Sequence, residues 1–190
     1  MPRAHTDAVQ EAMAAVRREG FLPVRERGRA RYDGPIGIGH GQTNSQPRTV
    51  ADMLRLLDVR PGDRVLDVGA GSGWTTALLA HLTGPEGRVH GVELVPDLAA
   101  WGAQNLAREG FDHATLDPAD PDVLGLPEHA PYDRILVSAE ADRLPESLVD
   151  QLGEDGRMVV PVAGVMLLMT RTADGVATSE HGHYRFVPLR

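Results

Sequence analysis

The 190-residue chain contains no cysteine, which excludes disulfide bonds, thiolate zinc sites and a cysteine nucleophile. It has no long apolar run that resembles a signal peptide or a membrane-spanning segment. Its net charge is −8, so the phosphate backbone of a nucleic acid would meet no long-range attraction. We therefore expect a cytoplasmic monomer that binds neither a nucleic acid nor a membrane.

Aromatic residues are also scarce, at 4% of the chain. The densest basic segment has four arginines at alternate positions from Arg25 to Arg31, but Glu26 interrupts them and no aromatic side chain is interleaved. Single-stranded nucleic acids are usually bound by basic and aromatic side chains together. We interpret this segment as a solvated surface.

The length suits one domain that folds without metal or disulfide support. No internal repeat, low-complexity tract or linker divides the chain. We expect a single domain over residues 1–190. Residues 1–46 would form an N-terminal helix, an irregular arm and a loop, and residues 47–190 would form the core.

Short apolar runs alternate with helical patterns over most of the chain. Strands are predicted at residues 64–68, 88–93, 114–117, 132–138, 157–162, 165–172 and around 183–187, and helices at 5–19, from 47 onward, and at 74–82, 97–109 and 144–152. Repeated strand-helix units predict an α/β fold with a mostly parallel sheet flanked by helices. Helices disappear after Leu152, which predicts an antiparallel hairpin at the C-terminal end.

A glycine loop, residues 69–73, separates the strand at 64–68 from the helix that follows; its residues are Gly69, Ala70, Gly71, Ser72 and Gly73. Amides of such a loop approach a ligand closely, and a helix start favours negative charge. The Gly-x-Gly-x-Gly spacing differs from the Gly-x-Gly-x-x-Gly of dinucleotide binders. A turn without a ligand and an NAD-binding site are the alternatives.

Two carboxylates flank this loop. Asp67 precedes it and can attract an amino group, directly or through water, while the loop amides accommodate a carboxylate. Glu93, followed by Leu94, ends the next strand, where an acceptor can take both hydroxyls of a ribose. This combination predicts a site for S-adenosylmethionine.

The segment Gly34 to Pro47 is too glycine-rich for a helix and too polar for a buried strand. Residues 42–46, Gln-Thr-Asn-Ser-Gln, can all donate and accept hydrogen bonds, which suits a small polar or anionic group. Pro47 is well placed in the first turn of a helix, so Ser45 lies at a helix N-terminus. A surface loop that only caps this helix is the alternative.

With both segments considered, the chain resembles the protein-L-isoaspartate O-methyltransferase family. The distinctive stretch is residues 39–47, Gly-His-Gly-Gln-Thr-Asn-Ser-Gln-Pro, and the similarity extends to residues 67–73, 130–135, 156–157, 161–162 and 185–189. The resemblance implies a Rossmann-like class I methyltransferase fold and methyl transfer from S-adenosylmethionine to the α-carboxylate of an isoaspartyl residue in a protein or peptide, for repair or modification. It implies that Ser45 orients the acceptor and that Thr43 and Gln42 shape the pocket. Helix capping is the structural alternative for Ser45, and a purely structural role is equally open for Thr43.

The chain departs from the family at two places. The usual Gly-Asp-Gly that contacts adenine is absent from residues 116–122, where Asp117, Asp120 or Asp122 can substitute. Residues 138–142 carry two acids, Glu140 and Asp142, where the family is mostly small and apolar, and Glu140 would repel an anionic peptide. Two rival functions are a methyltransferase for a small metabolite or a ribosomal peptide, and a degenerate binding module without turnover.

A metal site is not expected. His181 and His183 lie two residues apart on a predicted strand, but no third ligand has suitable spacing.

Overall fold

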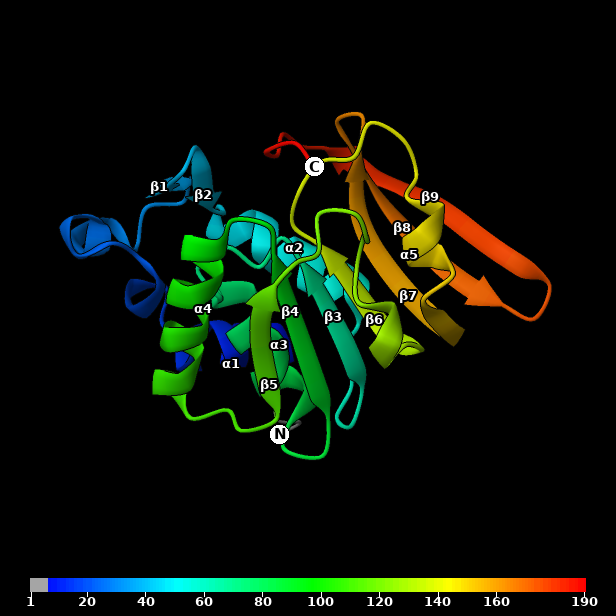
Figure 1. Cartoon of the computed structure of the whole chain (residues 1–190), viewed down its shortest axis with the longest axis horizontal. Coiled ribbons are helices and arrows are strands. Elements are labelled where there is room, and N and C mark those ends of the chain that lie inside the picture. Colours follow the sequence, from blue (N-terminus) through cyan, green and yellow to red (C-terminus); the bar gives the residue numbers. More distant parts are fainter. Residues whose placement is uncertain (1–6) are drawn as a thin grey trace, which may run out of the picture.

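The computed structural model describes residues 7–190. Within these residues, seven strands form one mixed sheet in the order β5-β4-β3-β6-β7-β8-β9 (Figure 1). The parallel strands are β3 (Arg64–Val68), β4 (Arg88–Glu93), β5 (Ala114–Pro118), β6 (Tyr132–Val137) and β7 (Leu152–Val162), and β8 (Val165–Thr172) and β9 (Gly175–His183) continue the sheet antiparallel. The predicted α/β fold with an antiparallel end is confirmed.

The two faces of the sheet are covered differently. The helices α1 (Ala8–Ala15), α2 (Pro47–Leu57), α3 (Trp74–Thr83) and α4 (Pro96–Glu109) bury their apolar side chains on one face. The short α5 (Glu146–Val149) and adjoining loops cover the other. Neighbouring residues of β3 point into different cores, Val65 toward the four helices and Leu66 toward α5, because side chains alternate along a strand.

The helix predicted at 5–19 is shorter in the structure. Its residues 5 and 6 lie outside the described part of the chain, and α1 ends at Ala15. A 3₁₀ turn, Arg18–Phe21, follows. The chain leaves the helical path because the Val16 carbonyl accepts a hydrogen bond from the Trp74 indole at 3.1 Å and the Arg18 side chain enters the interior.

The segment predicted as a loop contains a β-hairpin, formed by β1 (Ile36–Gly39) and β2 (Gln42–Asn44). That prediction was wrong in part, because Ile36 and Ile38 are buried while Gly37 and Gly39 face outward. His40 and Gly41 form the turn with φ values of 54° and 73°, the left-handed conformation that tight hairpins require.

Three boundaries in the C-terminal half also differ from the prediction. The helix expected at 144–152 is reduced to α5, and β7 begins at Leu152 instead of 157. The last strand spans Gly175–His183 instead of 183–187. Every residue of β9 is at least partly exposed, so its sequence carries no apolar alternation.

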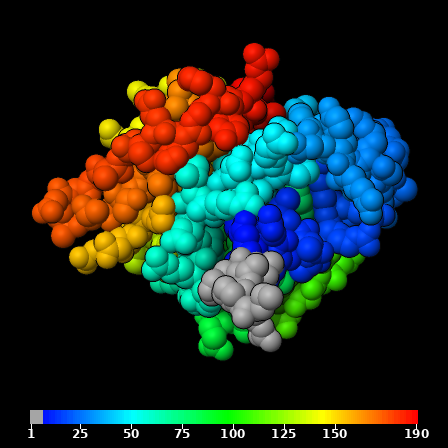
Figure 2. All heavy atoms as spheres, turned by 180° about the vertical axis from the view of Figure 1, so that it is seen from behind, coloured from blue at the N-terminus to red at the C-terminus, as the bar shows by residue number. Residues whose placement is uncertain are grey.

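Residues 184–190 instead run across the ends of the parallel strands, where Pro188 forms an isolated bridge with Glu140. In Figure 2, which shows the molecule from behind, the cyan α2 lies between the blue N-terminal segment and the orange and red β8 and β9.

Candidate active site

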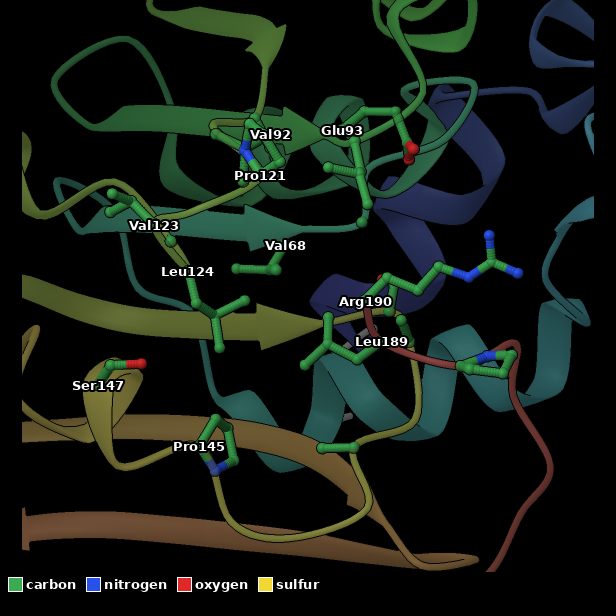
Figure 3. A pocket seen from close by; sticks show the side chains of 18 of the residues that line it. Val68, Val92, Glu93, Pro121, Val123, Leu124, Pro145, Ser147, Leu189 and Arg190 are labelled. Carbon is green, nitrogen blue, oxygen red and sulfur yellow. The ribbon is translucent and has the colours of Figure 1, made fainter.

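The site lies where the chain changes direction across the sheet. From β3 the strand order runs through β4 to β5 on one side, and β6 and β7 extend it on the other. Ligands of open α/β sheets bind at the carboxyl ends of the strands at such a switch point. A cleft of about 750 Å³, which we call the first cleft, opens there, and Gly69 and Ser138 line it. Figure 3 shows this cleft with Val68 and Glu93 labelled at the strand ends.

The glycine loop is a rigid turn. Gly69, Gly71 and Gly73 have φ values of 78°, 54° and 86°, which L side chains adopt only under strain. The amides of Gly69 and Ala70 donate to the Val92 carbonyl at 2.9 and 3.1 Å, and the Gly73 amide donates to the Ala70 carbonyl at 2.9 Å. Gly69 lines the first cleft, whereas Ala70, Gly71, Ser72 and Gly73 are not among its lining residues.

Glu93 and Leu94 line the first cleft at the end of β4, as their expected role requires. Glu93 is only 7% exposed. Its Oε2 accepts from the Gly71 amide at 2.8 Å, and its Oε1 accepts from the Val95 amide at 2.9 Å. Each carboxylate oxygen has a further lone pair, so Glu93 can accept two more hydrogen bonds.

Asp67 lies behind the cleft wall and is fully buried. Its Oδ2 accepts from the hydroxyls of Thr75 and Thr76, both at 2.7 Å. Its Oδ1 is buried and has no hydrogen-bond partner among residues 7–190. Burial raises the pKa of Asp67 to about 6 and the charge of Glu93 adds to this shift, although the hydroxyls of Thr75, Thr76 and the nearby Ser138 oppose it. A buried acceptor without a donor is a place for a bound donor group.

The loop after β5 forms the far side of the first cleft. Asp120 and Asp122 line it, whereas Asp117 is exposed and lies outside the wall. Figure 3 shows Val123 and Leu124 from this loop on one side of the cleft, with Pro145 facing them from the segment before α5. This apolar surface suits a flat ring better than a charged group.

A second cleft of about 690 Å³ lies on the other side of the C-terminal segment. Thr43 and Ser45 line it, while Gln42 lines the first cleft. The residue at the cap position of α2 is Gln46, so Ser45 is not the cap of that helix. Ser138 and Val187 line both clefts, and the two clefts therefore meet beside them.

The geometry agrees with comparisons to known proteins. A model of the protein-L-isoaspartate(D-aspartate) O-methyltransferase (PCMT) family matches residues 3–190. The chain belongs to this family. Protein-L-isoaspartate O-methyltransferases of Aeropyrum pernix and Methanopyrus kandleri are each 46% identical to it, over 95% and 97% of this chain and 72% and 84% of theirs.

A solved structure of a Plasmodium falciparum protein assigned to the same enzymes, in complex with S-adenosyl-L-homocysteine, matches with a TM-score of 0.86. It is 29% identical and the match covers 98% of this chain and 92% of that one. The family predicted from the resemblance of residues 39–47 is thus confirmed. The predicted Rossmann-like methyltransferase fold is confirmed as well.

The PCMT fold gives Glu140 a structural task that its sequence position did not indicate. Its amide donates to the Val187 carbonyl at 2.8 Å, its carbonyl accepts from Leu189 at 2.7 Å, and its Oε2 accepts from the Phe186 amide at 3.3 Å. Glu140 therefore holds the C-terminal segment between the clefts, instead of standing free at the mouth to repel a peptide. Asp142 lines the first cleft.

Two residues that shape this PCMT site, Ser138 and Gly102, have no predicted role. Ser138 follows β6 and borders both clefts; its position at the end of a central parallel strand is a signal that could have identified it. Gly102 on α4 lies against the glycine loop. No local pattern marks a helical glycine as such a contact.

Among residues 7–190 the structure contains no group of three or more histidine and carboxylate side chains that could hold a metal ion. His181 instead pairs with Ser179 at 2.8 Å. No helix within the described range is long and apolar enough to cross a membrane.

Proposed function

We propose that this chain transfers the methyl group of S-adenosylmethionine to the α-carboxylate of an isoaspartyl residue in a protein or peptide. The observation that carries the proposal is the meeting of two clefts beside Ser138 and Val187. One cleft has the acids suited to an adenosyl amino acid, and the other has the hydroxyls suited to an acceptor. Membership in the PCMT family supports the same reaction.

The residues of the first cleft, together with Asp67 behind its wall, fit the cofactor. The unpartnered Oδ1 of Asp67 would accept from its amino group, directly or through water, and Glu93 has capacity for two ribose hydroxyls. The apolar surface of Val123, Leu124 and Pro145 suits adenine, with Asp120 or Asp122 near its polar edge. When bound, the cofactor supplies a methyl group activated by a sulfonium.

The acceptor side needs orientation and no base. A carboxylate is already ionised at neutral pH, so no proton must be removed before it attacks. We assign Ser45 to orient this carboxylate and Thr43 to shape the second cleft, while Gln42 would stand at the junction with the first cleft. Uncharged donors align the oxygen without a strong ion pair, and alignment is the main source of rate in such a transfer.

We further propose that the enzyme works as a cytoplasmic monomer on protein or peptide substrates, without nucleic-acid or membrane partners. Both clefts are lined by one chain, the absence of cysteine suits a reducing compartment, and the net charge of −8 disfavours polyanions. Light scattering on the purified protein tests the monomer, and a dimer would contradict it.

The reaction is tested with a pair of peptides that differ only in an isoaspartyl or an aspartyl linkage. Labelled methyl transfer from S-adenosylmethionine should be found with the isoaspartyl peptide and be at least about a hundredfold slower with its twin. A small carboxylic acid metabolite serves as a third acceptor. Equal rates with both peptides, or transfer only to the metabolite, would refute the proposal, and transfer to none would support a module without turnover.

A further inference from the structure

Arg18 is a buried arginine at the base of the β1-β2 hairpin and is 5% exposed. Its Nε donates to Asn44 Oδ1 at 2.6 Å, and its Nη1 donates to the Tyr32 carbonyl at 2.8 Å. Its Nη2 lies 2.9 to 3.0 Å from the carbonyls of Gly34, Asn44 and Ser45. One guanidinium therefore joins both ends of the hairpin, including the backbone of Ser45, the proposed acceptor-orienting residue.

The side chain of Asn44 continues this contact to the glycine loop. Asn44 points away from the second cleft because side chains alternate along β2, and it is 5% exposed. Its Nδ2 donates to the Ser72 hydroxyl at 3.1 Å. A Cβ added to Gly71 would lie 3.2 Å from Ile38 Cδ1, so the hairpin also packs directly on this loop.

The glycine loop is fixed from its other side as well. The Asn105 side chain of α4 donates to the Ser72 carbonyl at 3.0 Å. Ser72 therefore lies between Asn105, on the helix after Glu93, and Asn44, on the acceptor hairpin. The path from Arg18 through Asn44 to Ser72 is continuous and buried.

The charge of Arg18 is not balanced by an ion pair within residues 7–190; its acceptors are four carbonyls and one amide oxygen. Burial lowers its pKa to about 10, so it stays charged at neutral pH. Its guanidinium carbon lies 5.5 Å from the centre of the Trp74 ring, at the start of α3. A buried arginine is costly unless its donors are used, and this one uses a fork geometry that lysine cannot reproduce.

We propose that Arg18 is a positioning residue, which acts through Asn44 and Ser45 to set the acceptor hairpin against the glycine loop. The kinetic consequence of this role rests on the proposed function. A shift of Ser45 relative to the loop would misalign the acceptor oxygen with the methyl group, and a misplacement of about 1 Å can cost about a hundredfold in rate.

The kinetic test compares Arg18→Lys with Arg17→Lys. Arg17 is the adjacent arginine, but its side chain is 76% exposed and pairs with Glu19 at the surface. With an isoaspartyl peptide at saturating S-adenosylmethionine, we expect Arg18→Lys to lower kcat about tenfold or more and to change the Kd for S-adenosylhomocysteine less than about threefold. Arg17→Lys should match the parent in both.

A double-mutant cycle separates positioning from general destabilisation. If Arg18 acts through Ser45, then Arg18→Lys should cost much less in kcat when Ser45→Ala is already present. Additive losses, or an unchanged kcat in Arg18→Lys, would overturn the proposal. Thermal unfolding of all four proteins shows whether each is folded at the assay temperature.

A second readout needs no methyl transfer. Hydrogen exchange of residues 36–45 is measured with and without S-adenosylhomocysteine, and its binding should slow exchange of the parent about fivefold or more. At saturating ligand the slowing should be lost in Ser72→Ala, because this variant removes the hydroxyl that accepts from Asn44 while it keeps all five contacts of Arg18. The slowing should also be lost in Arg18→Lys. Equal slowing in parent and variants would overturn the proposal. If the isoaspartyl peptide is not methylated, the proposed function fails while this measurement still decides the role of Arg18.

Discussion

Gly73 of the glycine loop and Gly102 of α4 lie so close that a Cβ on Gly73 would come within 2.9 Å of the Gly102 carbonyl oxygen. A Cβ on Gly102 would meet Leu116 Cδ1 at 2.7 Å and the Gly71 carbonyl oxygen at 2.8 Å. Two of these contacts are with backbone, which cannot swing aside. The helix after Glu93 is therefore packed directly on the loop, and the position of one determines the position of the other.

Replacement of Gly102 by alanine should destabilise the protein, although alanine favours a helix by about 1 kcal/mol. Overpacking against backbone costs about 1 to 3 kcal/mol, so we expect a net fall in melting temperature of a few degrees and weaker binding of S-adenosylhomocysteine. Calorimetry measures both. Gly28→Ala is the control, because a Cβ there meets nothing within 4 Å. A Gly102→Ala protein as stable and as tightly binding as the parent would contradict the close packing.

The central strands were predictable because their sequences are unambiguous. Val65 points to one face of residues 64–68, Leu66 and Val68 point to the other, Gly69 follows directly, and the observed β3 has the predicted bounds. The helix predicted from residue 47 onward is confirmed as α2, whose apolar stripe of Val50, Met53, Leu54 and Leu57 is buried. Both patterns are local, so an isolated segment reveals them.

What the sequence could not reveal depends on contacts between distant segments. Arg18 and Arg17 are adjacent arginines, yet only Arg18 meets Asn44, 26 residues away, and becomes buried. The hairpin at residues 36–44 was missed because glycines weaken the strand pattern in its sequence. In the folded protein the strand is stabilised by burial of Ile36 and Ile38. The position of β9 was predicted wrongly because none of its residues is buried, so its sequence has no apolar pattern that marks a strand.

Stability should depend on pH through Asp67. Its pKa in the folded protein is raised to about 6 by burial, above its unfolded value of 3.8. The folded state thus binds more protons between these values, so the contribution of Asp67 is fully present below about pH 4 and is lost as pH rises through 6. From the difference between the two pKa values, the loss by pH 7.5 is on the order of 3 kcal/mol.

The measurement is denaturant unfolding of the ligand-free parent and of Asp67→Asn between pH 4 and 8. Other groups titrate in both proteins, so the informative quantity is the difference between their free energies of unfolding. This difference should move in favour of Asp67→Asn as pH rises from 4 to 7.5. A difference that is constant with pH would mean that Asp67 titrates outside this range.

Glu93→Gln should weaken the cofactor site without unfolding the protein. The Glu93 carboxylate accepts from two amides, of Gly71 and Val95, whereas a glutamine side chain has one acceptor oxygen. One amide would lose its partner and the ribose would lose a charged acceptor, which together should raise the Kd for S-adenosylhomocysteine about tenfold to a hundredfold.

Titration calorimetry checks this change beside Glu109→Gln, which removes the same charge from an exposed position at the end of α4. The control should bind like the parent. If both variants weaken equally, net charge is responsible and the assignment of Glu93 to the ribose is wrong.

Ser45→Ala should reduce turnover while cofactor affinity stays near that of the parent, because Ser45 lines the second cleft and not the first. Loss of one orienting hydrogen bond should lower kcat for an isoaspartyl peptide about tenfold to a hundredfold. The backbone of Ser45 remains bound to Arg18 in this variant, so the hairpin should keep its place and the loss can be attributed to the hydroxyl. Thr43→Val removes a second hydroxyl from the lining of the same cleft and shows whether the loss is specific to Ser45. A Ser45→Ala protein with normal kcat and weakened S-adenosylhomocysteine binding would reverse the assignment, and Ser138, where the two clefts meet, would be the next hydroxyl to test.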